Sequence, residues 1–149
     1  MPRDSLTRKR PPGGDYAVNL PRSWLFHDAS IPSDHSTHLW QDPKNPFRKM
    51  EVVLSRCVGC AAKLPDMNLP DPSAVVPAGA SPFPIDEWSV GFQTYSNDNP
   101  YPDDGRVYVL HDNSDHPSGY VQVDLWLPVS QAEVASAILM SFAPTEPTQ

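Results

Sequence analysis

Four residues in the first half of the chain have the types and the spacing of a zinc site. His35 and His38 are separated by two residues, as are Cys57 and Cys60, and eighteen residues lie between the two pairs. Zinc binds four Cys or His ligands in a tetrahedron, and a tight turn brings both ligands of such a pair to one metal. The spacing is compatible with a closed structural zinc site, which we keep as one alternative, and otherwise the cofactor is not predicted. Uncoordinated residues are the simpler alternative, because small buried thiols are common.

The two cysteines also match the pattern of a redox pair. A C-x-x-C motif between a strand and a helix is typical of thioredoxin-like proteins. Pro65 follows Cys60 so closely that about one helical turn fits between them, which argues against that fold. A disulfide between Cys57 and Cys60 stays open for an oxidising compartment.

Catalytic groups are harder to find. Two histidines and two aspartates between residues 111 and 116 could form an acid–base pair, but such a group is recognised by its geometry, which a sequence lacks. No glycine-rich phosphate loop, G-x-S-x-G motif or H-E-x-x-H motif is present. We therefore assign no catalytic residue and keep a small metal- or thiol-dependent enzyme as an alternative.

The charges of the chain divide it into two unlike parts. The 149 residues carry a net charge of −7, but residues 1–63 hold ten of the eleven Lys and Arg against six acids, for +4. Residues 64–149 hold one Arg and twelve acids, for −11. The acidic part argues against a broad nucleic-acid surface, apart from weak phosphate contacts by the basic N-terminus.

The acidic loops of the second part are candidates for binding a partner. Asp98, Asp103 and Asp104 lie in a segment full of turn-forming residues. A calcium site would need six to eight oxygen ligands in a compact loop, and the EF-hand pattern is absent, so turn formation explains these residues better. Exposed carboxylates steer basic partners, which makes an acidic immunity-type inhibitor of a basic toxin or nuclease an alternative function.

The first 49 residues resemble neither a regular domain nor a solvated tail. Prolines interrupt every candidate helix, because proline lacks the N–H donor and restricts the preceding residue. Bulky apolar side chains are nevertheless present, and disordered segments usually lack them. We predict an extended, basic, proline-rich arm that docks on a partner, or on its own domain, through four aromatic anchors: Trp24, Phe26, Trp40 and Phe47.

The remaining pattern predicts a small α+β domain over residues 50–143. Apolar alternation predicts strands at 50–56, 88–95, 106–111 and 120–127, and helical spacing predicts a helix at 130–143. The expected fold is a small antiparallel sheet, a three-strand meander plus one earlier strand, covered by the C-terminal helix. A Pro/Ala-rich connector at 65–84 and a frayed tail at 144–149 complete the domain organisation.

The function that these features favour is non-catalytic. We expect a protein-interaction or assembly subunit that docks onto a larger complex, such as a virion, through the N-terminal arm. No run of 18 apolar residues is present, so no membrane partner is expected. Few cysteines and no visible signal peptide favour the cytoplasm, or a particle assembled there, as the location. The oligomeric state is not predicted.

Overall fold

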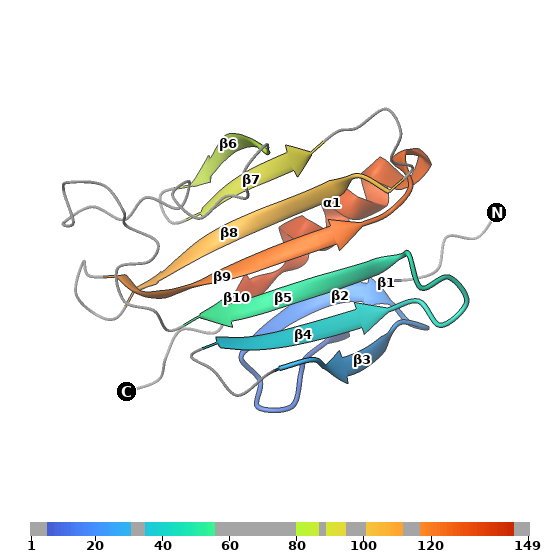
Figure 1. Ribbon diagram of the computed structural model, residues 1–149, viewed down its shortest axis with the longest axis horizontal. Coiled ribbons are helices and arrows are strands. Elements are labelled where there is room, and N and C mark those ends of the chain that lie inside the picture. The colour runs from blue at the N-terminus through green and yellow to red at the C-terminus, as the bar shows by residue number, and fades with distance from the viewer. Residues whose placement is uncertain are drawn as a thin grey trace.

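The described part of the chain is mostly β-structure. The computed structural model describes residues 6–30, 35–55, 80–86, 89–94, 101–111 and 117–144. These residues form ten strands, a short 3₁₀ helix (Val129–Gln131) and one α-helix, α1 (Ala132–Ser141) (Figure 1). The strands are β1 (Leu6–Lys9), β2 (Tyr16–Pro21), β3 (Leu25–Asp28), β4 (His35–Gln41), β5 (Lys49–Ser55), β6 (Ser81–Asp86), β7 (Ser89–Thr94), β8 (Asp103–His111), β9 (Pro117–Trp126) and β10 (Ala143–Pro144).

Seven of these strands form one antiparallel sheet in the order β3-β4-β5-β9-β8-β7-β6. Its centre is the pairing of β5 with β9, in which Met50 is opposite Leu125 and Val52 is opposite Val123. Side chains alternate between the two faces of a strand, so these four apolar residues share one face. All four are buried, and this face of the sheet forms the floor of the core.

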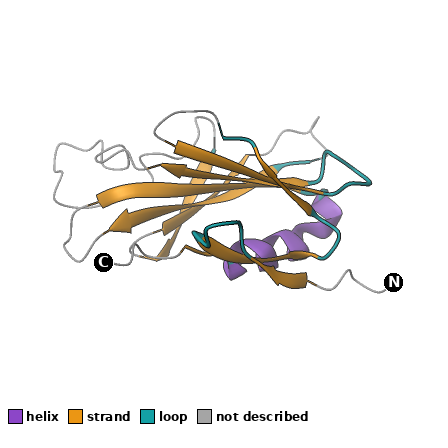
Figure 2. Ribbon diagram, turned by 90° about the horizontal axis from the view of Figure 1, so that it is seen from below, coloured by secondary structure: helices purple, strands orange, loops and turns teal. Residues whose placement is uncertain are grey.

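A second layer covers that face. It consists of α1 and a three-stranded sheet in the order β1-β2-β10, and Figure 2 shows the helix and the small sheet on the same side of the large sheet. Tyr16, Val18 and Leu20 of β2 and Ile138 of α1 pack into the same core cluster as the β5 and β9 side chains. No helix in the described ranges is long and apolar enough to cross a membrane.

The predicted fold class is wrong, chiefly because of the first 49 residues. They are not an arm but supply β1 to β4 and the start of β5, so the described part holds ten strands in two sheets beside one short helix. The prolines lie at positions where a missing N–H costs little. Pro11 and Pro12 form the first half of a turn that a hydrogen bond from the Gly14 N–H to the Pro11 carbonyl closes at 3.0 Å, and the φ angles of Gly13 and Gly14 are 93° and 69°. Only glycine adopts such angles without strain, and this turn joins β1 to β2.

The predicted elements of the second half lie close to observed ones. The strands expected at 88–95, 106–111 and 120–127 correspond to β7, β8 and β9, and α1 lies inside the expected helix. The expected connector at 65–84 overlaps β6, which begins at Ser81 and forms one edge of the large sheet. Residues 65–79 of the connector lie outside the described residues.

Candidate binding pocket between the helix and the sheet

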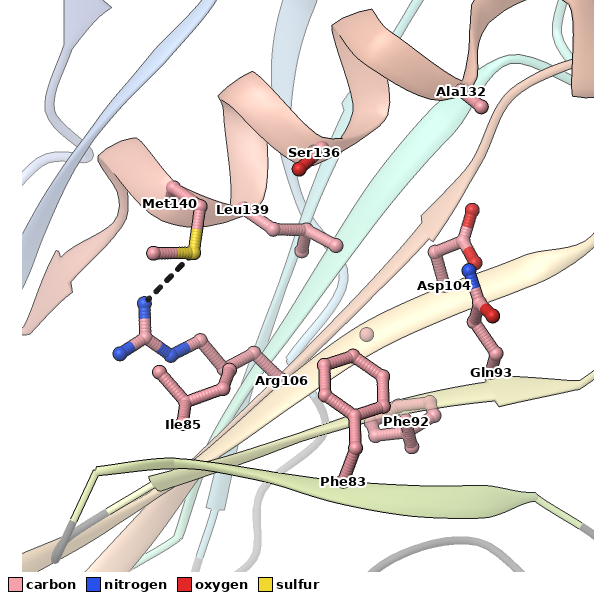
Figure 3. Close-up of a pocket in the computed structure, with 11 residues that line it drawn as sticks. Phe83, Ile85, Phe92, Gln93, Asp104, Arg106, Ala132, Ser136, Leu139 and Met140 are labelled. Atoms are coloured by element: carbon pink, nitrogen blue, oxygen red, sulfur yellow. Dashed lines mark hydrogen bonds between the residues drawn. The ribbon is translucent and has the colours of Figure 1, made fainter.

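A pocket of about 110 Å³ lies between α1 and the β6 side of the large sheet (Figure 3). The helix forms one wall, and strands β6, β7 and β8 form the other. The lining residues are Phe83, Ile85, Phe92, Gln93, Asp104, Gly105, Arg106, Ala132, Ser136, Leu139 and Met140. Most of these are apolar, so the few polar groups among them determine what the pocket can bind.

The register of the strands brings the pocket residues together. Gly91 of β7 pairs with Phe83 of β6 on one side and with Arg106 of β8 on the other. A Cβ atom on Gly91 would lie 2.3 Å from the Phe83 ring, so the ring occupies the space that a side chain at position 91 would fill. Glycine at this position lets the aromatic ring of the edge strand lie across β7 toward the pocket.

Arg106 is a buried cation at one end of the pocket. Its Nε and Nη2 atoms donate hydrogen bonds to Oγ of Ser89 at 3.2 and 2.9 Å, and Nη1 lies 4.0 Å from Sδ of Met140. The guanidinium carbon lies 4.4 Å from the centre of the Tyr108 ring. A guanidinium is weakly hydrated and stacks on aromatic rings, which helps this charge to lie away from water.

Asp104 is a buried carboxyl group at the opposite end. It is 8% exposed, and its Oδ1 atom has no hydrogen-bond partner among the described residues. Burial raises the pKa of Asp104, while a hydrogen bond with the Gln93 side chain acts in the other direction. Figure 3 shows Asp104 and Gln93 on the Ala132 side and the Arg106 guanidinium on the Met140 side. A buried acceptor without a partner costs about 1–3 kcal/mol of folding stability.

Two large apolar side chains of the pocket are exposed. Phe83 of β6 is 45% exposed, and Met140 of α1 is 60% exposed. Methionine is flexible and polarizable, and both residue types are enriched where proteins bind one another. The pocket therefore combines an exposed apolar surface with a buried acceptor.

A second polar group lies on the other face of the large sheet. Glu51 of β5 is opposite Asp124 of β9, and Asp103 of β8 lies close to Asp124. Burial, with the charge of Asp124, raises the pKa of Asp103 to about 8, and burial also raises the pKa values of Glu51 and Asp124. Within the described ranges, no group of three His, Cys, Asp or Glu side chains is placed to hold a metal ion.

The predicted aromatic anchors have different environments. Trp24 and Trp40 are buried in the core of the chain itself. Phe26 is half-buried and contacts the Trp40 ring edge-on, at 4.9 Å between centroids. Phe47 alone of the four is well exposed, at 69%, and its ring stacks on Tyr101. Two of the four are therefore not available to a partner in this structure.

The predicted acidic residues are also separated. Asp103 and Asp104 are consecutive in β8, so the strand directs them to opposite faces of the sheet. Asp104 belongs to the pocket, and Asp103 belongs to the carboxyl cluster behind it. Asp98 lies outside the described residues.

Only part of the predicted zinc site can be located. His35 and His38 lie in the extended strand β4 rather than in the expected tight turn. The Nδ1 atom of His38 is 3.0 Å from the Tyr16 hydroxyl, which also accepts a hydrogen bond from Nε1 of Trp40 at 2.9 Å. Burial lowers the pKa of His38. Cys57 and Cys60 lie outside the described residues, so the four are not seen together.

Sequence reasoning named Asp104 as a partner-binding residue but missed Arg106 and the exposed apolar groups of the pocket. Arg106 is the single Lys or Arg of residues 64–149, and it alternates in phase with Asp104 and Tyr108 along one strand. A charged residue on the apolar side of a strand could have indicated this site. The sequence around Phe83 did not indicate a strand or a binding residue, because prolines of the expected connector lie on both sides of it.

Comparison with solved structures identifies the fold. The chain is similar to the solution structure of cyanobacterial PsbP (CyanoP) from Synechocystis sp. PCC 6803, with a TM-score of 0.58 and 14% identity over 97% of this chain and 95% of that one. The chain has a PsbP-like fold. At this level of identity the similarity concerns the fold alone.

Other comparisons add no function. A second solved structure, the Saccharomyces cerevisiae Ran-binding protein Mog1p, matches with a TM-score of 0.47 and 10% identity over 95% of this chain and 97% of that one. At this TM-score, the similarity to Mog1p does not establish a shared fold. No protein-family model matches the chain, and no curated protein matches it.

Proposed function

We propose that this chain is a protein-interaction domain that binds its partner at the pocket between α1 and β6. The observation that carries the proposal is the placement of Phe83 and Met140, both well exposed, beside a largely apolar pocket. Exposed aromatic and methionine side chains beside a pocket are typical of binding surfaces.

The size of the pocket favours an anchor side chain over a free cofactor. Pockets for drug-sized ligands usually enclose about 300–1,000 Å³. This one, at about 110 Å³, has room for a single large side chain. The exposed surface beside it would then contact the rest of the partner, as the surroundings of an interface hot spot do.

The surface in this proposal differs from the arm expected from the sequence. Trp24 and Trp40 stabilise the fold from inside, so the proposal does not depend on them. Membership of a larger assembly stays part of the proposal, with the pocket of α1 and β6 as the docking surface. The PsbP-like fold provides the scaffold and does not identify the partner.

Site-specific photo-crosslinking in cells of the source organism tests the proposal. The photoreactive residue p-benzoylphenylalanine is placed at Phe83 or Met140, and for the control at Leu25, which is 62% exposed on β3 at the other edge of the sheet. We expect one protein to be crosslinked from positions 83 and 140 and not from position 25. Equal crosslinking from all three positions, or none from 83 and 140, would refute the proposed surface.

A further inference from the structure

We propose that the partner binds as a basic amphipathic helix that lies along α1 and inserts one aliphatic side chain, such as leucine, into the pocket. This inference rests on the proposed function and names the structure and the chemistry of the partner segment. It follows from where the exposed apolar side chains lie, from the shape of the pocket, from the edge strand β6 and from the charge of the pocket walls.

The exposed apolar side chains of the chain gather around the pocket. Five large apolar side chains are exposed among the described residues, and three of them are Phe83, Val129 and Met140. Phe83 belongs to β6 and Met140 to α1, and Val129 lies in the short helix directly before α1. Apolar side chains that are exposed singly are normal on a protein surface, whereas a group of them beside a pocket marks a surface for binding another protein.

The pocket extends along two turns of α1. Its residues on the helix lie at positions i, i+4, i+7 and i+8, and they are Ala132, Ser136, Leu139 and Met140. A helix rises 1.5 Å per residue, so this stretch is about 12 Å long. Figure 3 shows these residues on the helix wall and Phe83 on the strand wall. Two turns of a partner helix have the same length, and they present an apolar stripe with the spacing i, i+4, i+7.

The interior of the pocket suits an aliphatic anchor. A cavity of about 150 Å³ holds benzene, with six carbon atoms, so about 110 Å³ accommodates the four carbon atoms of a leucine side chain. Phe83 and Leu139 supply apolar walls. Oδ1 of Asp104 is closed off from solvent, and the Arg106 guanidinium donates to Oγ of Ser89. Neither charged group therefore requires a polar group on the anchor.

The edge strand β6 favours a helix over an extended partner segment. An added strand gains its affinity from main-chain hydrogen bonds to a sheet edge, and β6 is the sheet edge beside the pocket. Pro82 and Pro84 lie in this strand and have no N–H to donate, and prolines on an edge strand oppose the addition of another strand. On the other wall, Ala132 and Ser136 are small, so a second helix can approach α1 closely.

The charges of the walls favour a basic partner. Strands β6, β7 and β8 and helix α1 all lie within residues 64–149, which contain twelve acids and a single Lys or Arg, Arg106. Arg106 is buried, so these four elements present no exposed lysine or arginine, and Glu133 of α1 is exposed. We therefore expect Lys or Arg residues beside the apolar stripe of the partner helix, because opposite charges steer association.

Crosslinking from two positions on α1 tests whether the partner segment is a helix. In cells of the source organism, p-benzoylphenylalanine replaces Glu133 or Met140, both exposed, and mass spectrometry locates the crosslinked residues of the partner. The two positions are about 10 Å apart along α1. The crosslinked residues should lie about seven positions apart in a partner helix, which has the same rise per residue. In an extended segment, with about 3.3 Å per residue, they would lie about three positions apart.

Two further measurements test the anchor. Ser136→Trp fills the pocket and should reduce crosslinking from position 140 about tenfold, whereas Leu25→Trp places the same side chain on exposed β3 and should change it less than about twofold. Urea unfolding checks that both variants keep the native stability. A synthetic peptide of the crosslinked partner segment should bind the native chain, and replacing its aliphatic residue between the two crosslinked sites by alanine should weaken binding about tenfold.

Failure of this inference can be distinguished from failure of the proposed function. Crosslinked residues about three positions apart, or crosslinking from position 140 without position 133, would refute the helix while the docking surface stands. Unchanged crosslinking in Ser136→Trp, or unchanged binding of the alanine peptide, would refute the aliphatic anchor in the same way. If positions 83, 133 and 140 crosslink no more than position 25, the proposed function fails and the partner helix fails with it.

Discussion

Two glycines of the large sheet leave space for phenylalanine rings, and we predict that alanine is tolerated at one and not at the other. A Cβ atom on Gly105 would lie 2.0 Å from Cζ of Phe92, and one on Gly91 would lie 2.3 Å from the Phe83 ring. Both distances are far below van der Waals contact, so each ring must move. The Phe92 ring is completely buried, whereas the Phe83 ring is 45% exposed and can turn toward solvent.

The expected losses follow from this difference. Overpacking a buried site costs about 1–3 kcal/mol, and removing a buried phenylalanine from its site costs about 3–5 kcal/mol. Gly105→Ala should therefore lower the free energy of unfolding by about 2–4 kcal/mol. For Gly91→Ala the loss should stay below about 1 kcal/mol, because alanine also reduces the entropy of the unfolded chain by a comparable amount.

Urea unfolding followed by tryptophan fluorescence measures both values. The two variants should share the native slope against denaturant, so that a change in midpoint reports stability. Equal losses of stability in the two variants, or a loss below about 1 kcal/mol for Gly105→Ala, would refute the argument from ring crowding.

Three further predictions use the same unfolding assay. Asp103, whose pKa is raised to about 8 by burial and by Asp124, is stabilising when protonated, so the native chain should lose stability as pH rises from 5 to 8. In Asp103→Asn, the loss of stability between pH 5 and pH 8 should be about 1–2 kcal/mol smaller than in the native chain, a value that already includes a reduction for solvent screening. Parallel plots of stability against pH for the variant and the native chain would contradict this prediction. Tyr16→Phe should cost about 1–3 kcal/mol, because Nδ1 of His38 and the Trp40 indole lose a buried partner; a neutral effect would exclude the network as a stabilising one. Trp24→Ala should lower the free energy of unfolding by about 3–5 kcal/mol, because Trp24 is buried, and Phe47→Ala should lower it by less than about 1 kcal/mol, because Phe47 is exposed. The reverse order would contradict the placement of Trp24 in the core.

The strands predicted best are those with clear alternation. In β9, apolar Val121, Val123 and Leu125 alternate with Gln122 and Asp124, and such a pattern identifies a half-buried strand without knowledge of its partners. The prediction for the first 49 residues is wrong because prolines that interrupt every candidate helix do not exclude strands. In the structure, Pro21 ends β2, and Pro11 and Pro12 lie at a turn, where a missing N–H costs little.

The pocket could not be predicted, because it depends on register. Phe83 and Arg106 are neighbours only through Gly91, in a pairing of three strands that no local pattern specifies. The solvent exposure of Met140 likewise depends on which face of α1 packs on the sheet. Aromatic residues in the first half were recognised as anchors, but the sequence does not distinguish packing inside the chain from packing on a partner.

Because β2 pairs with β10, completion of the core depends on residues that lie far apart in the sequence. Ala17 pairs with Ala143, and Tyr16 pairs with Pro144, so β10 is made 126 residues after the part of β2 with which it pairs. The ring of Tyr16 also stacks on Phe142, so its burial is completed only after the helix has been made. The core can therefore be completed only after residue 142 has been made, and contacts this distant in sequence slow folding. Deleting the residues from Phe142 onward would remove a core side chain and expose the ring of Tyr16, so this deletion should destabilise the whole fold.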